Sequence, residues 1–318
     1  MKQTHILVIE IKKFGFEIGQ TLYSVQEQND RGEFNYRYWE HPKENYKLQN
    51  TPFYLKSEND FIHFTTIDSL YSILNTGFLR LYNLNNMDDK YEMEYAFREL
   101  AFKGTTEKSK EELYCLSMCS SEKVFTEKTK EKEHLLWKLH GRDGHGVILR
   151  LKIENNLNWY FYHLSEIYYG VDDFSSIKSF NTTIDNQFLD EKICCFIKNP
   201  VYRFESEIRL IFDNRIPVTV TDKNNQKIYP ITYPDKLHIS TKTFYFQVPI
   251  VNYFKNLSDP MYLAANMQGI DYEIPKIKIT EIILGYRYSV KDLETIKSKL
   301  DAKYSDINIR ITDLKEMY

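Results

Sequence analysis

Two glutamates one residue apart are the clearest candidates for chemistry in this sequence. Glu205 and Glu207 lie in the stretch 204–212, where apolar and polar residues alternate as in a half-buried strand. The alternation would place both carboxylates on one strand face, which must meet water or a ligand. Neighbouring carboxylates can raise each other's pKa and divide the roles of base and electrostatic stabiliser. The alternative is structural, with Arg203 or Arg209 pairing with these glutamates on a solvated face.

A histidine and a tryptophan are further candidates for contact with a ligand. His63 lies in a short apolar strand predicted over 61–64, and Trp137 lies in a helix predicted over 130–140. Each also has a structural interpretation, in which His63 is a core histidine with satisfied hydrogen bonds and Trp137 packs its helix against the core. We favour packing for Trp137. We expect the functional end of the molecule to gather around His63, Trp137, the turn 87–92 and the two glutamates.

The turn 87–92 carries a second acidic cluster, formed by Asp88, Asp89 and Glu92. Carboxylate oxygens are suitable ligands for Mg²⁺, so this cluster and the two later glutamates could support phosphodiester hydrolysis. Asp88 and Asp89 also stand where they would cap a following helix and favour its positive end. We favour the capping role and expect no catalytic magnesium.

The histidines and cysteines do not form a standard metal site. His134, His140 and His145 have no carboxylate or cysteine nearby that would complete a ligand set. The four cysteines lack the C-x2-C spacing of zinc sites: Cys115, Cys119, Cys194 and Cys195. We therefore expect buried free thiols and no metal.

Hydrophobic spacing predicts the elements that position these residues. The strand at 61–64 stops at Thr65, Thr66 occupies a helix N-cap position, and Gly77 is placed to end that helix. Strands are predicted over 113–118, 147–153, 278–284 and 307–311, and helices over 92–102, 130–140 and 290–300. In the helix over 130–140, three leucines are expected to face inward: Leu135, Leu136 and Leu139.

The fold class predicted from these elements is α+β, with mixed or antiparallel sheets flanked by helices. We interpret 53–318 as one main domain, with a β-hairpin insertion near 214–254. Residues 1–52 are interpreted as a β-rich N-terminal extension because they combine the apolar stretch 6–11 with a turn signal at 29–32.

Composition limits the classes of partner. The chain has 318 residues, 42% hydrophobic and 27% charged, which is typical of a globular protein. A formal charge of -3 gives no overall field that would attract nucleic acid or an anionic membrane. No signal peptide or membrane-spanning run is recognisable, so we expect a cytoplasmic protein without a membrane partner. The 25 tyrosines and 20 phenylalanines provide surfaces for core packing and for stacking on rings.

Several segments together resemble the bacterial domain of unknown function numbered twenty-nine seventy-one. The resemblance extends from about residue 53 to residue 300. It is carried by His63-Phe64-Thr65, Leu135-Leu136-Trp137, Gly146-Val147, and the stretches 203–209 and 281–285. The N-D-P-[FY]-E turn of that family stands here as Asp88-Asp89-Lys90-Tyr91-Glu92, with Asp in place of Asn and Lys in place of Pro.

A looser resemblance concerns function. The His-x-Thr start, the short helix ending in glycine and the late Glu-x-Glu strand are similar to ADP-ribosyltransferases, including the DNA-modifying toxin group. This resemblance implies a split sheet, NAD as substrate, and a protein or nucleic acid as acceptor. It also implies the site residues: His63 and Thr65 on the nicotinamide side, Arg80 on a phosphate, and Glu207 promoting transfer. To these we add Glu205 as a further catalytic candidate, which would share the work with Glu207, and Trp137 as a further candidate contact for NAD.

The residue types suit that reaction, because cleavage between nicotinamide and ribose develops oxocarbenium character that a carboxylate stabilises. Our favoured hypothesis is an NAD-utilising ADP-ribosyltransferase-like protein, such as a bacterial toxin or phage-defence effector. It requires His63, Thr65 and Glu207 to converge on one cleft. One alternative is a magnesium-dependent phosphodiesterase or nuclease. The other is a non-catalytic module that senses a nucleotide or a protein through its aromatic residues, with the hairpins after Asn214 as contact surface.

Overall fold

The structure is a computed structural model. It describes residues 22–23, 37–38, 48 and 50–314, the last range without 88–90, 92, 126–129, 158, 160, 184–190, 215–219, 222–226, 229–232, 235–242, 255–273 and 301–303. The apolar stretch predicted as a strand at 6–11 lies outside the described residues. So do Asp88, Asp89 and Glu92, and with them the predicted acidic turn.

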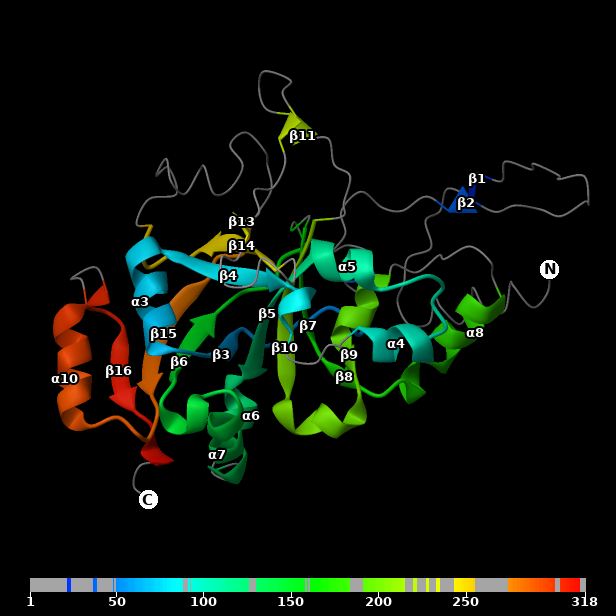
Figure 1. The fold of residues 1–318 in the computed structure, drawn as a ribbon. Helices are drawn as coiled ribbons and strands as arrows, with labels where there is room; N and C mark the ends of the chain where they lie inside the picture. Colours follow the sequence, from blue (N-terminus) through cyan, green and yellow to red (C-terminus); the bar gives the residue numbers. More distant parts are fainter. Residues whose placement is uncertain are drawn as a thin grey trace, which may run out of the picture.

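One large mixed sheet, mostly antiparallel, organises the described residues (Figure 1). Its main path runs β13 (Tyr233–Pro234), β14 (Phe244–Pro249), β4 (Phe78–Asn83), β5 (Leu113–Ser120), β3 (Asp60–Thr65), β6 (Val147–Lys152), β15 (Lys278–Leu284) and β16 (Asn308–Ile311). A branch leaves β5 through β10 (Glu207–Asp213) to β7 (Tyr162–Glu166). Only the β15–β16 pair in this sheet is parallel among the described pairings. The predicted α+β class is therefore confirmed.

The branch arises because β5 is shared by three strands. Along one edge it pairs with β10 from Leu113 to Cys119, all but its last residue. Its other edge is divided, since β4 pairs with it near Cys115 and β3 pairs with it near Cys119. Among the described residues no strand covers 116–118 on that second edge. The sheet is split there, and the candidate site lies at the split.

Helices cover both faces of the sheet, because side chains along each strand alternate between two hydrophobic clusters. In β6, Leu149 and Leu151 join a cluster with α3 (Ile67–Thr76) and α10 (Val290–Lys299). Ile148 points to the opposite face, where α6 (Ser121–Phe125) and α7 (Lys130–Leu139) pack. A third cluster lies under α4 (Glu94–Glu99), α8 (Ser175–Thr183) and the 3-10 helix η5 (Glu191–Phe196), at the far end of the molecule in Figure 1.

The remaining described elements are short. They are α5 (Glu107–Glu112), the 3-10 helices η1 (Leu84–Asn86), η3 (Arg142–Gly144), η4 (Asp172–Phe174) and η6 (Pro200–Glu205), and three two-stranded pairs: β1 (Leu22–Tyr23) with β2 (Arg37–Tyr38), β8 (Tyr168–Tyr169) with β9 (Ile197–Lys198), and β11 (Val220–Thr221) with β12 (Lys227–Ile228). The antiparallel β11–β12 pair falls in the predicted hairpin region, which is described only in part. The proposed domain boundaries at 52 and 214–254 stay predictions.

The best-predicted elements are those with complete local signals. Thr66 caps α3 by accepting a hydrogen bond from the Ser69 backbone N–H, and Gly77 ends the helix with φ 79°. Strand β15 has the bounds predicted for it. The inward orientation predicted for two leucines was wrong: of the three leucines in α7 only Leu136 is buried, whereas Leu135 and Leu139 are 39% and 53% exposed.

The hydropathy of the described helices shows whether any of them could cross a membrane. In the part of the chain that the structure describes, no helix combines the length and the apolar character that crossing a bilayer requires.

Candidate functional site

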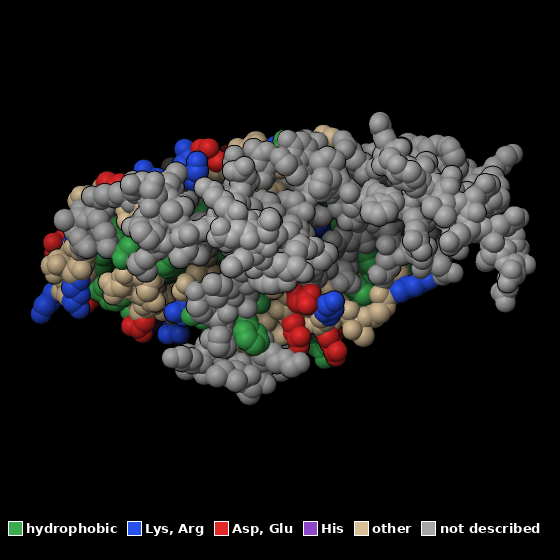
Figure 2. Space-filling model, turned by 90° about the horizontal axis from the view of Figure 1, so that it is seen from above, with side chains coloured by type: hydrophobic (Ala, Val, Ile, Leu, Met, Phe, Trp, Pro, Cys, Tyr) green, Lys and Arg blue, Asp and Glu red, His purple; other side chains and the backbone are tan. Residues whose placement is uncertain are grey.

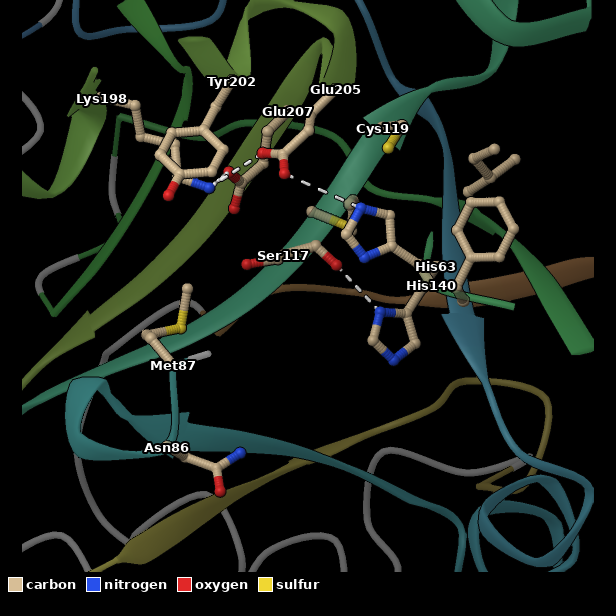
Figure 3. A pocket seen from close by; sticks show the side chains of 13 residues that line it. His63, Asn86, Met87, Ser117, Cys119, His140, Lys198, Tyr202, Glu205 and Glu207 are labelled. Atoms are coloured by element: carbon tan, nitrogen blue, oxygen red, sulfur yellow. Dashed lines mark hydrogen bonds and ion pairs between the residues drawn. The ribbon is translucent and has the colours of Figure 1, made fainter. Parts of the chain in front are cut away.

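A cavity of about 620 Å³ opens where β3 and β5 separate (Figure 3). Strands β3 and β5 supply its wall, and η1, β9, η6 and β10 close it together with Met87 and His140, which follow η1 and α7. The described residues that line it are Ile62, His63, Phe64, Asn86, Met87, Ser117, Met118, Cys119, His140, Lys198, Tyr202, Glu205 and Glu207. Of the three residues that the sequence hypothesis required to converge, His63 and Glu207 therefore line one cavity, and Thr65 does not.

Lys198 joins the two candidate glutamates. Its Nζ donates to Glu205 Oε2 at 2.9 Å and to Glu207 Oε2 at 2.8 Å, and it lies over the Tyr202 ring at 5.2 Å from the centroid. Arg209 holds Glu207 from behind, with Nε 2.7 Å from Oε1. Its Nη1 donates to the Cys195 carbonyl at 2.7 Å.

The interpretation that Glu207 and Arg209 lie on a solvated strand face is wrong, because Glu207 is only 6% exposed and Arg209 is fully buried. The predicted Arg209–Glu207 pair does form, but in the interior. Arg203 instead donates to the Tyr169 carbonyl.

The backbone between the glutamates departs from a strand. Glu205 ends the 3-10 helix η6, and β10 begins only at Glu207, so the expectation that both lie on one regular strand is wrong. Ser206 between them is left-handed, with φ 49° and ψ 47°. Its hydroxyl accepts a hydrogen bond from Lys132 of α7. This bend directs both carboxylates at the same ammonium group.

Left-handed backbone occurs between two lining residues of the cavity. Among the described non-glycine residues, four have positive φ, and of these only Ser206 lies between lining residues, Glu205 and Glu207. Such conformations persist only where the surrounding structure enforces them, and they are concentrated at functional sites. The position of Ser206 therefore supports this cavity as the functional site.

Electrostatics keep Glu207 ionised. Burial acts to raise its pKa, but the charges and hydrogen bonds of Arg209 and Lys198 outweigh burial and hold the pKa at about 2. The expectation that the two glutamates raise each other's pKa is therefore wrong for Glu207. Its carboxylate remains an anion whose charge two cations already balance.

We expect acid to destabilise the protein through Glu207. Its pKa falls from an ordinary 4.5 to about 2 on folding, so the folded state binds this proton more weakly than the unfolded chain. The contribution is complete above about pH 4.5 and is lost as the pH falls through 2. Urea denaturation across this range should show the free energy of unfolding declining more steeply in the wild type than in Glu207→Gln, which cannot titrate. Equal declines would contradict this assignment.

Glu205 presents a freer oxygen to the cavity than Glu207 does. While Lys198 contacts Glu205 Oε2, the other oxygen has only His140 Nε2 at 3.8 Å among the contacts of the described residues (Figure 3). His140 follows α7 and is partly exposed. Chemistry that needs an accessible carboxylate therefore favours Glu205.

His63 takes the place of a strand partner for β5. Its Nδ1 lies 2.9 Å from the Ser117 carbonyl, which can only accept, so Nδ1 carries the proton. Burial lowers the pKa of His63 and favours the neutral ring, although the bond to Ser117 acts in the opposite direction. Nε2 is then an acceptor, and Figure 3 shows it on the side of the ring away from Ser117. His63 can bind or orient a ligand.

Cys119 also lines the cavity but is a poor nucleophile. Burial, reinforced by the charges of Glu207 and Glu205, raises the pKa of its thiol to about 12. The cysteines at all four positions are free and buried, as predicted.

Three of the candidate NAD contacts do not line the cavity. Thr65 follows the lining residue Phe64 on β3 without itself contributing. Arg80 of β4 lies over the Tyr245 ring at 4.5 Å. Trp137 is buried, donates to Glu133 Oε1 at 3.2 Å, and packs edge-on against Phe64. It supports the cavity wall from outside, in agreement with the packing role favoured for it.

Several site residues were missed by sequence reasoning, above all Lys198. The signal for it was present, because Lys198 ends an apolar run, Ile193 to Ile197, where a lysine needs a buried partner. Tyr169, whose hydroxyl accepts from the Glu207 backbone N–H at 2.9 Å, was missed as well. Ser117 had no recognisable signal, since its role depends on where β3 and β4 end.

The described surface charges and potential metal ligands do not indicate a further site. On the face seen in Figure 2, the described acidic and basic side chains are interspersed rather than separated by sign. Among the residues that the structure describes, no group of three or more His, Cys, Asp or Glu side chains is placed to hold a metal ion.

Comparisons of the chain with family models, curated proteins and solved structures found no match. Both resemblances noted in the sequence therefore stay predictions.

Proposed function

We propose that this protein binds NAD in the cavity at the β3–β5 split and cleaves its nicotinamide–ribose bond, as an ADP-ribosyltransferase or NAD glycohydrolase does. The observation that supports this most is the meeting of His63 and Glu205 in one cavity, from segments far apart in the sequence. A volume of about 620 Å³ falls within the range of small-molecule sites, roughly 300–1,000 Å³.

Each residue has a separate role in this proposal. Glu205 provides the carboxylate for the oxocarbenium-like ribose, because one of its oxygens faces the cavity. Lys198 and Glu207 hold Glu205 in place. His63 orients the nicotinamide side. Among the described lining residues Lys198 is the only lysine or arginine, and it already pairs with two carboxylates, so the phosphates of NAD extend toward the cavity mouth.

Incubation of purified protein with NAD, with and without cell lysate, tests this proposal. We expect release of nicotinamide, measured by chromatography, and, with NAD labelled in its adenosine, labelling of a lysate component if the ADP-ribosyl group is transferred. His63→Asn should lower the rate, whereas His145→Asn, outside the cavity, should not. Absence of nicotinamide release under both conditions would contradict the enzymatic proposal.

A second candidate is a non-catalytic sensor of a small ligand. The contact of Lys198 with Glu205 favours it, because a carboxylate already paired with a cation stabilises a developing positive charge less well. Ligand-dependent thermal stabilisation without turnover would support this candidate. The magnesium-dependent phosphodiesterase stays an alternative whose acidic turn lies outside the described residues.

A further inference from the structure

The open edge of β5 presents main-chain groups to the cavity. Ser117 is the only residue of this strand that is not buried, and it lies midway between the positions covered by β4 and by β3. On that edge no described strand residue stands opposite it. A central strand normally has its hydrogen bonds satisfied on both sides, so this gap calls for another partner.

The direction of the Ser117 N–H follows from the ladder with β10. Opposite residues in an antiparallel pair alternate between those that exchange both main-chain hydrogen bonds and those that exchange none. Ser117 stands opposite Arg209, but its carbonyl accepts from His63 on the other edge. The Ser117–Arg209 pair is therefore one that exchanges none. The N–H of Ser117 points the same way as its carbonyl, toward the cavity.

The groups that lie beside the Ser117 N–H disfavour an anionic ligand. His63 carries its proton on Nδ1, so its neutral ring offers a lone pair at Nε2. Glu205 adds a carboxylate oxygen to the same cavity. Phe64, Met87 and Met118 contribute apolar surface suited to a flat ring.

We propose that the open edge of β5 recognises a neutral amide on a flat ring: the Ser117 N–H donates to the amide oxygen, and His63 Nε2 accepts from the amide N–H. This inference rests on the proposed function only for the location of the site. The amide can come from a ring carboxamide, as in nicotinamide, or from the lactam of a nucleobase, as in hypoxanthine. The cavity should reject the matching carboxylate.

Serine-specific ¹⁵N labelling tests this directly in the full chain. The Ser117 amide signal is assigned by its loss in Ser117→Ala, and the wild type is titrated with nicotinamide, hypoxanthine, nicotinate and purine. We expect the Ser117 signal to shift with at least one of the two amides. Nicotinate and purine, which lack the amide, should bind at least about tenfold more weakly, as expected when a buried polar group loses its partner. The arm that shifts the signal identifies the source.

Variants separate this inference from NAD chemistry. His63→Asn should weaken amide binding by about tenfold, whereas His145→Asn should leave it unchanged. An unmoved Ser117 signal with both amides, or equal affinity for nicotinamide and nicotinate, would overturn the inference. A shifted signal in a protein that never releases nicotinamide from NAD would keep the inference and remove the proposed function. Nicotinamide release from NAD with an unmoved Ser117 signal would keep the proposed function and remove the inference.

Discussion

Replacement of Lys198 by methionine should lower the free energy of unfolding by about 3–5 kcal/mol, the usual consequence of removing one partner from a buried ion pair. Lys198 is 10% exposed and bridges Glu205 and Glu207, which are 12% and 6% exposed. Without it, two nearby carboxylates face each other with one fewer cation. Urea denaturation at pH 7 measures the loss.

A matched lysine controls for the loss of a buried side chain. Lys110 is 11% exposed, but its partner Glu94 is 45% exposed and can be solvated. We expect Lys110→Met to cost about 1 kcal/mol or less. Adding Glu205→Gln to Lys198→Met should restore part of the stability, because it removes one unpaired carboxylate. Equal losses for the two single lysine variants would show that Lys198 is not the centre of a charge network.

Glu205→Gln should reduce NAD cleavage by roughly two orders of magnitude, the scale of deleting one preorganised electrostatic contact. The amide keeps the shape of the side chain but removes the negative charge. The Michaelis constant should change little, because that charge acts mainly in the transition state. Steady-state measurement of nicotinamide release determines both values.

Glu281→Gln is the control for this substitution. Glu281 is as buried as Glu205 and also pairs with cations, Arg150 and Arg310, but it lies on β15 outside the cavity lining. The turnover of the Glu281→Gln variant should stay within about twofold of the wild type. A Glu205→Gln enzyme with the wild-type rate would remove Glu205 from the mechanism. If Glu207→Gln alone abolished turnover in a protein of unchanged stability, the carboxylate roles would be reversed.

The elements that the sequence predicted well are those with local causes. Thr66 and Gly77 delimit α3 by capping bonds between residues close in the sequence, and β15 shows an apolar run ended by Gly285. His63 and the two glutamates were found as candidates because polar residues stand out in apolar strands. For these parts, residues close together in the sequence are sufficient to predict the structure.

The remaining parts depend on contacts between distant segments. The bend at Ser206 is held in part by Lys132, and no periodicity reveals a left-handed serine. Leu135 and Leu139 fit an inward helical pattern, yet Leu136 is the leucine of α7 that reaches the core. The cavity itself exists because β3 and β4 pair with different ends of β5, which is a property of topology.

The divided edge of β5 also has a consequence for folding. His63 and Ser117 are 54 positions apart in the sequence, and Glu207 comes from a third strand that must find β5 later in the chain. Closing such long loops costs entropy before the contacts repay it, and non-local pairings of this kind fold slowly. The binding site therefore cannot form in an isolated fragment that lacks any of these strands, and a nascent chain acquires it only after β10 has been synthesised.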